Sequence, residues 1–352
     1  MKILYGVQGT GNGHISRARM MAKHLNARGA DVQFLFSGRD FDNYFDMEVF
    51  GDYQLRHGLS FATRNGRISH LHTVLEAKPL RFINDVRSLP LDDIDVIVTD
   101  FEPVTAWAGR LRNKPVVGIG HQYAFGHPDV PQRGVDFNNR LVMRYFAPAK
   151  YRIGLHWHHF NAAIVPPIIN PKETLLPPTL PPHFVVYLPF ENQQQVLEAL
   201  NKIPGYRFIQ YAPTLEDKEL GNVSQRRTNL HGFKKDLCSA QGVICNAGFE
   251  LISECLHMGI PALAKPVTGQ SEQLGNAAAL EALGHASVML EFSLDRIKQW
   301  LAGLPRQMPQ RYPDVAEALC DWLMQGHWHD SDDLVQSLWQ RSGDPLIRAK
   351  AS

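Results

Sequence analysis

Short apolar runs alternate with amphipathic stretches along the first half of the chain. Each run is almost wholly apolar, which is typical of strands buried on both faces in a parallel sheet. The stretches between the runs repeat their apolar residues at helical spacing, as helices do when one face packs on a sheet. This pattern predicts an α/β unit with strands at residues 2–7, 32–36, 94–99 and 115–119, and helices at 15–28 and 103–112.

A proline-rich segment divides this unit from a second one of the same kind. Its sequence, PPIINPKETLLPPTLPP, excludes a long helix and is typical of an extended linker. The alternation then predicts strands at 184–188, 206–211, 243–245 and 261–264, and helices at 193–200, 251–258, 273–283, 294–301, 315–325 and around 335–339. The expected organisation is a domain at 1–165, a linker at 166–182, a second domain at 183–328 and a final helix within 329–352.

Composition limits the class of protein. A length of 352 residues suits about two domains, and a net charge of +1 gives no support to nucleic-acid binding. The four cysteines form no CxxC pair, and no apolar run is long enough to span a membrane. Residues 1–8 resemble a strand more than a signal peptide. We therefore expect a cytoplasmic protein, at most bound to the inner face of a membrane.

The most informative polar residues lie between 242 and 284. Asn246, Ala247 and Gly248 come between a predicted strand end and a helix start, where free N–H groups and the helix dipole favour a phosphate. Glu254 lies two turns into that helix and could bind a diol. Amides and carboxylates suited to sugar hydroxyls follow the next strand, at Gln270, Glu272, Gln273 and Asn276. Since strand ends of an open α/β sheet face one crevice, these groups together predict a nucleotide-sugar site. The alternative is a plain strand–turn–helix unit.

A glycine-rich loop follows the first predicted strand. Its glycines, Gly9, Gly11 and Gly13, are spaced GxGxG, whereas a dinucleotide site requires GxGxxG and an acidic residue at the end of the second strand. Ser37 ends that strand here. The spacing therefore disfavours a dehydrogenase, and the glycines would instead let a ligand approach the backbone closely.

The segment 242–284 resembles the nucleotide-sugar signature of GT-B glycosyltransferases of families 1 and 28. In that signature a phosphate-binding His precedes a ribose-binding Glu by eight positions; here Asn246 takes the first position and Glu254 the second. An acidic–Gln pair followed three residues later by Asn contacts the donor sugar in the family, and Glu272, Gln273 and Asn276 match it. This sequence departs from the signature at the side chain that contacts the phosphate, because Asn246 replaces the His.

The resemblance implies both a fold and a reaction. The fold class is α/β, with two Rossmann-like domains facing across a cleft, the acceptor on the first and the donor on the second. The reaction is inverting transfer of a sugar from a nucleotide-diphosphate sugar, UDP-linked, to a hydroxyl acceptor such as a lipid or a cell-envelope glycan. The donor is a substrate, and neither a metal nor another cofactor is expected.

The resemblance also implies a base. His14 stands where many family-1 members have the base that deprotonates the acceptor, and imidazole suits this task because its pKa lies near neutral pH. Asp100, after the strand at 94–99, matches the Asp that orients this base. Each has an alternative: His14 could bond to backbone at a helix start, and Asp100 could cap the next helix.

The remaining site residues follow from the same resemblance. We expect Gly11, Gly13, His121 and Gln122 on the acceptor side. The segment 229–233 is expected to be a short strand, and Phe233 is expected to hold the base of the nucleotide through its backbone. The donor side would then comprise Phe233, Asn246, Ala247, Gly248, Phe249, Glu254, Gln270, Glu272, Gln273 and Asn276.

Two further stretches are ambiguous. Residues 61–87 mix apolar and basic side chains and could contact anionic lipid headgroups or an anionic acceptor, although a helix with a solvated charged face is the preferred interpretation. The run His156-Trp157-His158-His159 suggests a metal site, but adjacent histidines converge poorly on one ion and no matching carboxylates lie nearby in the sequence.

Two other functions remain open at this stage. A sugar-nucleotide epimerase shares the two-domain architecture and would turn over the nucleotide sugar without an acceptor. A non-catalytic nucleotide-sugar-binding protein would need Glu254 but neither His14 nor Asp100.

Overall fold

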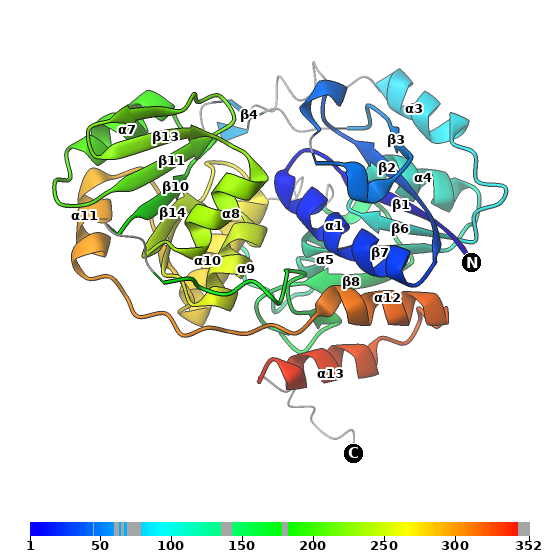
Figure 1. Ribbon diagram of the computed structural model, residues 1–352. Helices are drawn as coiled ribbons and strands as arrows, with labels where there is room; N and C mark the ends of the chain where they lie inside the picture. Colours follow the sequence, from blue (N-terminus) through cyan, green and yellow to red (C-terminus); the bar gives the residue numbers. More distant parts are fainter. Residues whose placement is uncertain are drawn as a thin grey trace.

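The computed structural model describes residues 1–44, 46–59, 63–64, 67–68, 79–134, 143–177 and 182–343. These residues form two α/β units that stand side by side (Figure 1). The first sheet is parallel, with the order β3-β2-β1-β6-β7-β8-β9. Its strands are β1 (Lys2–Gln8), β2 (Asp31–Ser37), β3 (Tyr53–Leu55), β6 (Val96–Asp100), β7 (Val116–Gly120), β8 (Tyr151–Leu155) and β9 (Ile164–Val165). Its helices are α1 (Asn12–Ala27), α3 (Pro79–Ser88), α4 (Pro103–Leu111) and α5 (His121–Ala124), and β4 (Thr63–Arg64) and β5 (Arg67–Ile68) form a separate ribbon.

The second sheet repeats this plan, with the order β12-β13-β11-β10-β14-β15-β16 and one antiparallel pair, β12 with β13. Its strands are β10 (Phe184–Tyr187), β11 (Phe208–Ala212), β12 (Lys218–Leu220), β13 (Val223–Arg227), β14 (Gly242–Asn246), β15 (Ala262–Lys265) and β16 (Ser287–Val288). Its helices are α7 (Gln193–Asn201), α8 (Leu230–Cys238), α9 (Phe249–Met258), α10 (Ser271–Leu283) and α11 (Leu294–Ala302). The prediction of two Rossmann-like units is confirmed.

The chain returns to the first unit earlier than predicted. Both α12 (Val315–Gln325) and α13 (Asp332–Arg341) lie against the first unit (Figure 1). The Cys320 thiol on α12 lies 3.7 Å from the Met21 carbonyl on α1, and the Trp339 indole on α13 donates to the Ile164 carbonyl at 2.7 Å. Apolar periodicity predicts a helix but not the surface on which that helix packs. The second domain was therefore predicted to extend to residue 328, whereas it ends before α12.

The segment predicted to be a linker lies partly outside the described residues, because only 166–177 and 182 of it are described. The described part is extended and contains no helix or strand, as the prolines require. Ile168 and Ile169 are nevertheless buried, so this part packs on the protein.

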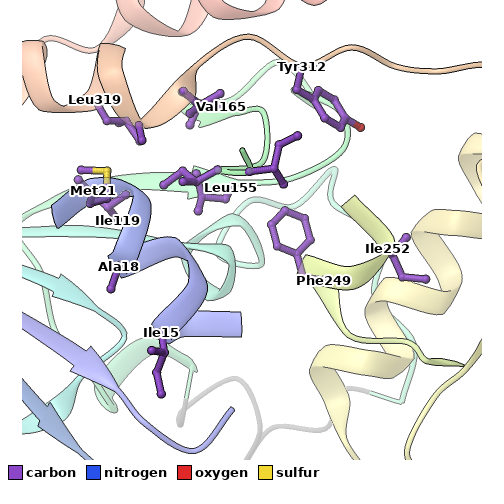
Figure 2. Packing of buried hydrophobic residues seen from close by; sticks show 14 of the residues in the cluster. Ile15, Ala18, Met21, Ile119, Leu155, Val165, Phe249, Ile252, Tyr312 and Leu319 are labelled. Carbon is purple, nitrogen blue, oxygen red and sulfur yellow. The ribbon is translucent and has the colours of Figure 1, made fainter. Parts of the chain in front are cut away.

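One large apolar cluster joins the two units. Figure 2 shows Ile15 and Met21 of α1, Leu155 of β8, Phe249 of α9 and Leu319 of α12 within it. These side chains come from both sheets' helices and strands, so burial of apolar surface holds the two units against each other. The site lies beside this cluster.

The turn between β6 and α4 is held by Glu102. This fully buried carboxylate accepts from the Val104 and Thr105 amides at 2.8 and 2.7 Å, and from the Ser37 hydroxyl at 2.6 Å. Glu102 is therefore the N-cap of α4, a role that the sequence left open for Asp100. Phe101, between them, has a φ of 52°, a strained conformation that this network maintains.

Loss of this cap should be costly. Replacing Glu102 with Ala leaves the Ser37 hydroxyl and two buried amides without an acceptor, and we expect the free energy of unfolding to fall by about 2–4 kcal/mol. Urea denaturation of the variant and of a control at the exposed carboxylate Glu198 measures the effect. Equal stability of the two variants would contradict this role.

Candidate active site

His14 and Asp100 meet at the carboxyl edge of the first sheet. His14 lies in the first turn of α1, directly after β1, and Asp100 ends the neighbouring strand β6. His14 Nδ1 is 2.9 Å from Asp100 Oδ1, and the two residues are 9% and 1% exposed. The structure thus brings together two residues that lie far apart in the sequence, and the imidazole bonds to a carboxylate, not to backbone.

The ring of His14 is oriented with Nε2 towards the second unit. Its Nε2 lies 3.4 Å from Gln122 Nε2, and that amide nitrogen donates to Glu272 Oε2 at 2.9 Å. The Glu272 carboxylate requires the NH2 end of Gln122 on this side, so His14 Nε2 faces a hydrogen-bond donor. His14 Nδ1 lies 2.9 Å from both Asp100 Oδ1 and Arg17 Nη2. A proton on Nδ1, donated to Asp100, would give the tautomer that a general base needs.

Arg17 is a member of the site that the sequence analysis missed. Its Nε and Nη2 donate to the two oxygens of Asp100 at 3.1 and 2.8 Å, and its Nη1 pairs with Glu250 of α9. Burial alone would raise the pKa of Asp100, but the charges of Arg17 and His14 hold it below its ordinary value. The signal was available, since Arg17 lies three residues after His14 and therefore on the same helix face.

Glu250 explains one glycine of the first loop. A Cβ on Gly13 would lie 2.7 Å from Glu250 Cγ, so only glycine lets the starts of α1 and α9 approach this closely. The Arg17 ion pair favours ionised Glu250, but burial opposes it more strongly and raises the pKa of Glu250 to about 7. The two units are therefore joined here by a carboxyl that titrates near neutrality.

This pKa predicts a pH-dependent stability. Folding raises the pKa of Glu250 from 4.5 to about 7, so between these values the folded protein holds a proton that the unfolded chain has released. The contribution is complete below pH 4.5 and is lost as the pH rises through 7, by on the order of 3 kcal/mol. Urea unfolding at pH 5 and pH 8 should therefore show wild type losing more stability than Glu250→Gln. Parallel losses would contradict this assignment.

His121 bridges the two units. Its ring stacks on Phe249 of α9, with centroids 3.9 Å apart and planes at 7°. Its Nδ1 lies 2.8 Å from the Leu155 carbonyl and its Nε2 lies 2.7 Å from Asn276 Oδ1 of α10. His121 is fully buried, and burial lowers its pKa. Three residues that the sequence assigned to acceptor and donor thus meet at one interface between the units.

The predicted phosphate position lies at the start of α9. Gly248 is its N-cap and supplies no side-chain bond, so the first amides of the helix are uncapped by side chains. Asn246 and Ala247, immediately before it, are 6% and 0% exposed. Asn246 Nδ2 donates to the Lys265 carbonyl at 3.1 Å, which orients the amide at the strand end.

Glu254 is held by a lysine. Lys234 Nζ on α8 lies 2.6 Å from Glu254 Oε1 and 2.9 Å from Glu173 Oε2 in the segment between the sheets. Burial raises the pKa of Glu254, and Lys234 opposes that effect. The lysine contact thus engages Oε1 of the Glu254 carboxylate.

The predicted sugar-binding set divides into two pairs. Gln273 and Asn276 are buried: Gln273 Oε1 accepts from the Val267 amide at 2.9 Å, and Asn276 Nδ2 donates to the Ala247 carbonyl at 2.9 Å. These two side chains support the loops of the site. Gln270 and Glu272, at the start of α10, are only partly buried, and Glu272 accepts from Gln122.

The expectation for residues 229–233 is wrong. This segment is not a strand, because Asn229 caps α8 and Phe233 lies inside that helix, where its amide donates to the Asn229 carbonyl at 3.1 Å. The Phe233 ring packs edge-on against Tyr187 and Tyr211. Asn is among the residues preferred at a helix N-cap, so Asn229 could have been recognised in the sequence as a helix start.

A cavity of about 780 Å3 opens beside Gln122 and Glu272. Most of its lining comes from residues 122–132 of the first unit, and Ser271 and Glu272 of α10 complete it. The cavity is therefore lined both by Gln122, which contacts His14, and by Glu272 of the predicted donor side.

The histidine run forms no metal site in the described residues. Three of its rings, those of His156, His158 and His159, each accept a backbone amide through Nδ1, at 2.8–2.9 Å. Across the described residues, no three His, Cys, Asp or Glu side chains lie close enough to hold a metal ion. The described helices also include none that is long and apolar enough to cross a membrane.

The two α/β units, each built on a mainly parallel sheet, have the GT-B fold. The chain belongs to glycosyl transferase family 1, whose profile matches residues 1–305. An uncharacterized glycosyltransferase of Methanosarcina mazei is 25% identical over 341 residues, covering 83% of this chain and 86% of that protein.

Solved structures show the same fold. MurG of Acinetobacter baumannii superposes with a TM-score of 0.56 at 16% identity, over 92% of this chain and 100% of that chain. The spinosyn rhamnosyltransferase SpnG complexed with thymidine diphosphate gives a TM-score of 0.53 at 13% identity, over 94% and 96%. At these identities the likeness bears on the fold alone.

Proposed function

We propose that this glycosyltransferase moves a sugar from a nucleoside-diphosphate sugar, UDP-linked, to an acceptor hydroxyl with inversion. The observation that carries the proposal is the orientation of His14, with Nδ1 on Asp100 and Nε2 directed to the junction of the units, close to the start of α9. A base on one unit and a phosphate position on the other are the two groups that such a transfer requires.

In the proposed reaction, His14 Nε2 removes the proton of the acceptor hydroxyl while its oxygen attacks the anomeric carbon. The bond from that carbon to the diphosphate breaks, and the amides at the start of α9 stabilise the leaving diphosphate. Attack opposite the leaving group inverts the anomeric carbon. Asp100 stabilises the imidazolium and holds its tautomer.

The donor would lie along the second sheet, with Glu254 on the ribose and with Gln270 and Glu272 on the sugar. The acceptor would enter through the cavity beside Gln122. The thymidine diphosphate in the SpnG structure makes dTDP-sugars the second class of donor to test.

A peripheral location at the cytoplasmic face of the membrane is part of the proposal. About half of the basic stretch at 61–87 lies outside the described residues, but α3 is described. It exposes Leu80 and Ile83, by 82% and 44%, beside the exposed Arg81 and Arg87. Apolar and basic side chains on one exposed helix suit an anionic lipid surface.

Calorimetric titration of UDP, dTDP and their hexose and N-acetylhexosamine derivatives into the wild-type protein tests the proposal. We expect at least one nucleotide and its sugar derivative to bind with one site per chain. Failure of every nucleotide and nucleotide sugar to bind would contradict it.

A further inference from the structure

We infer that Lys265 is the cation that binds the diphosphate of the donor, and that Glu191 takes the position of a phosphate oxygen until the donor displaces it. This inference rests on the proposed function, and it supplies the side-chain contact that the replacement of His by Asn246 leaves open. Neither Lys265 nor Glu191 was singled out as a donor contact by the family resemblance.

The order of the second sheet brings the three residues together. Strands β10, β14 and β15 are neighbours and run parallel, so the residues at their carboxyl ends share one edge. Asn246 ends β14 and is the register partner of Lys265, which ends β15, while Glu191 lies in the turn after β10. The same edge carries the uncapped start of α9.

Two donors converge on a single oxygen. Lys265 Nζ lies 2.7 Å from Glu191 Oε1, and Asn246 Nδ2 lies 3.3 Å from the same atom. The ammonium also reaches the Pro266 carbonyl at 3.3 Å. The donors are thus the ammonium of Lys265 and the NH2 group of Asn246, whose Oδ1 takes no part in this contact. An anionic oxygen at the Glu191 Oε1 position would keep both donors satisfied.

A purely structural role does not explain this pair. Lys265 is 4% exposed, and a buried ion pair contributes little stability beyond well-packed apolar residues of similar size. Lys265 extends from the end of a central strand, whereas Glu191 lies in a turn and its side chain is 14% exposed. The carboxylate can therefore rotate outward while the ammonium stays in place. The Lys265 ammonium would then add a full positive charge to the partial positive charge at the start of α9, and both would face the diphosphate.

The test compares a nucleoside diphosphate with its nucleoside. Affinities of UDP and uridine, or of dTDP and thymidine if those bind, are measured by calorimetry for wild type, Glu191→Gln and the double variant K265M/E191Q. The double variant removes both charges and so leaves no unpaired buried ion. We expect its affinity for the diphosphate to fall roughly ten- to hundredfold with the nucleoside unchanged. Glu191→Gln removes the competing charge and should bind the diphosphate several-fold tighter.

The controls are Glu198→Gln and Lys202→Met, on and directly after α7 and outside the cluster. An unchanged ratio of diphosphate to nucleoside affinity in both test variants would overturn the inference, as would weaker diphosphate binding by Glu191→Gln. These outcomes are distinct from failure of the proposed function, in which wild type itself binds no nucleotide.

Discussion

Replacing His14 with Ala should lower the turnover number for sugar transfer by about 10²–10⁴-fold while donor affinity stays at the wild-type level. The imidazole directs Nε2 towards Gln122, which lines the cavity, and its loss removes the proposed base without touching the second sheet. Transfer is measured as release of nucleoside diphosphate at saturating donor, and affinity by calorimetry.

The matched control for this variant lies on the same helix. His24 on α1 pairs with Asp314, with Nε2 3.1 Å from the carboxylate, and is remote from Asp100. His24→Ala should keep the turnover number within a few-fold of wild type. If His14→Ala transferred sugar as fast as His24→Ala, His14 would not be the base.

Replacing Glu254 with Ala should weaken nucleotide binding by roughly ten- to hundredfold, because a carboxylate–hydroxyl bond to the ribose is charge-assisted. The effect should be the same for the nucleoside and for the nucleoside diphosphate, since both contain the ribose. Lys234 keeps Glu173 as a partner in the variant, so no buried ion is left unpaired.

Glu281 provides the control for this second variant. It lies on α10, where it pairs with Arg133 at 2.7 Å, and both side chains are more than a third exposed. Glu281→Ala should bind nucleotides as wild type does. Wild-type affinity in Glu254→Ala would show that the ribose lies elsewhere.

The sequence predicted the parts of the molecule that local pattern controls. Strands such as β6 and β14 are short apolar runs buried along their whole length, so periodicity located them. Asn246 and Asp100 could be placed at strand ends, which parallel sheets align on one edge. The placement of His14 beside Asp100 followed from the same rule together with the family resemblance.

What the sequence did not predict depends on contacts between distant segments. Arg17 and Glu250 meet only because the starts of α1 and α9 lie close together. Lys265 and Glu191 meet because β14 lies between β10 and β15 in the sheet, which brings the carboxyl ends of these two strands to the same edge. Asn276 was expected at the sugar, but the packing of α10 directs it to His121. Side-chain partners of this kind are set by the tertiary fold, not by spacing along one element.

The most direct test of the proposed reaction is a transfer assay with mass spectrometry. Wild-type protein is incubated with each donor that binds and with fractions of lipids, polysaccharides and small metabolites as acceptors, beside His14→Ala. We predict an acceptor that gains the mass of one sugar residue, with release of one nucleoside diphosphate per transfer, and almost none with the variant. Conversion of the donor sugar to an isomer without any acceptor would instead identify an epimerase, and binding without turnover in every fraction would contradict the transferase account.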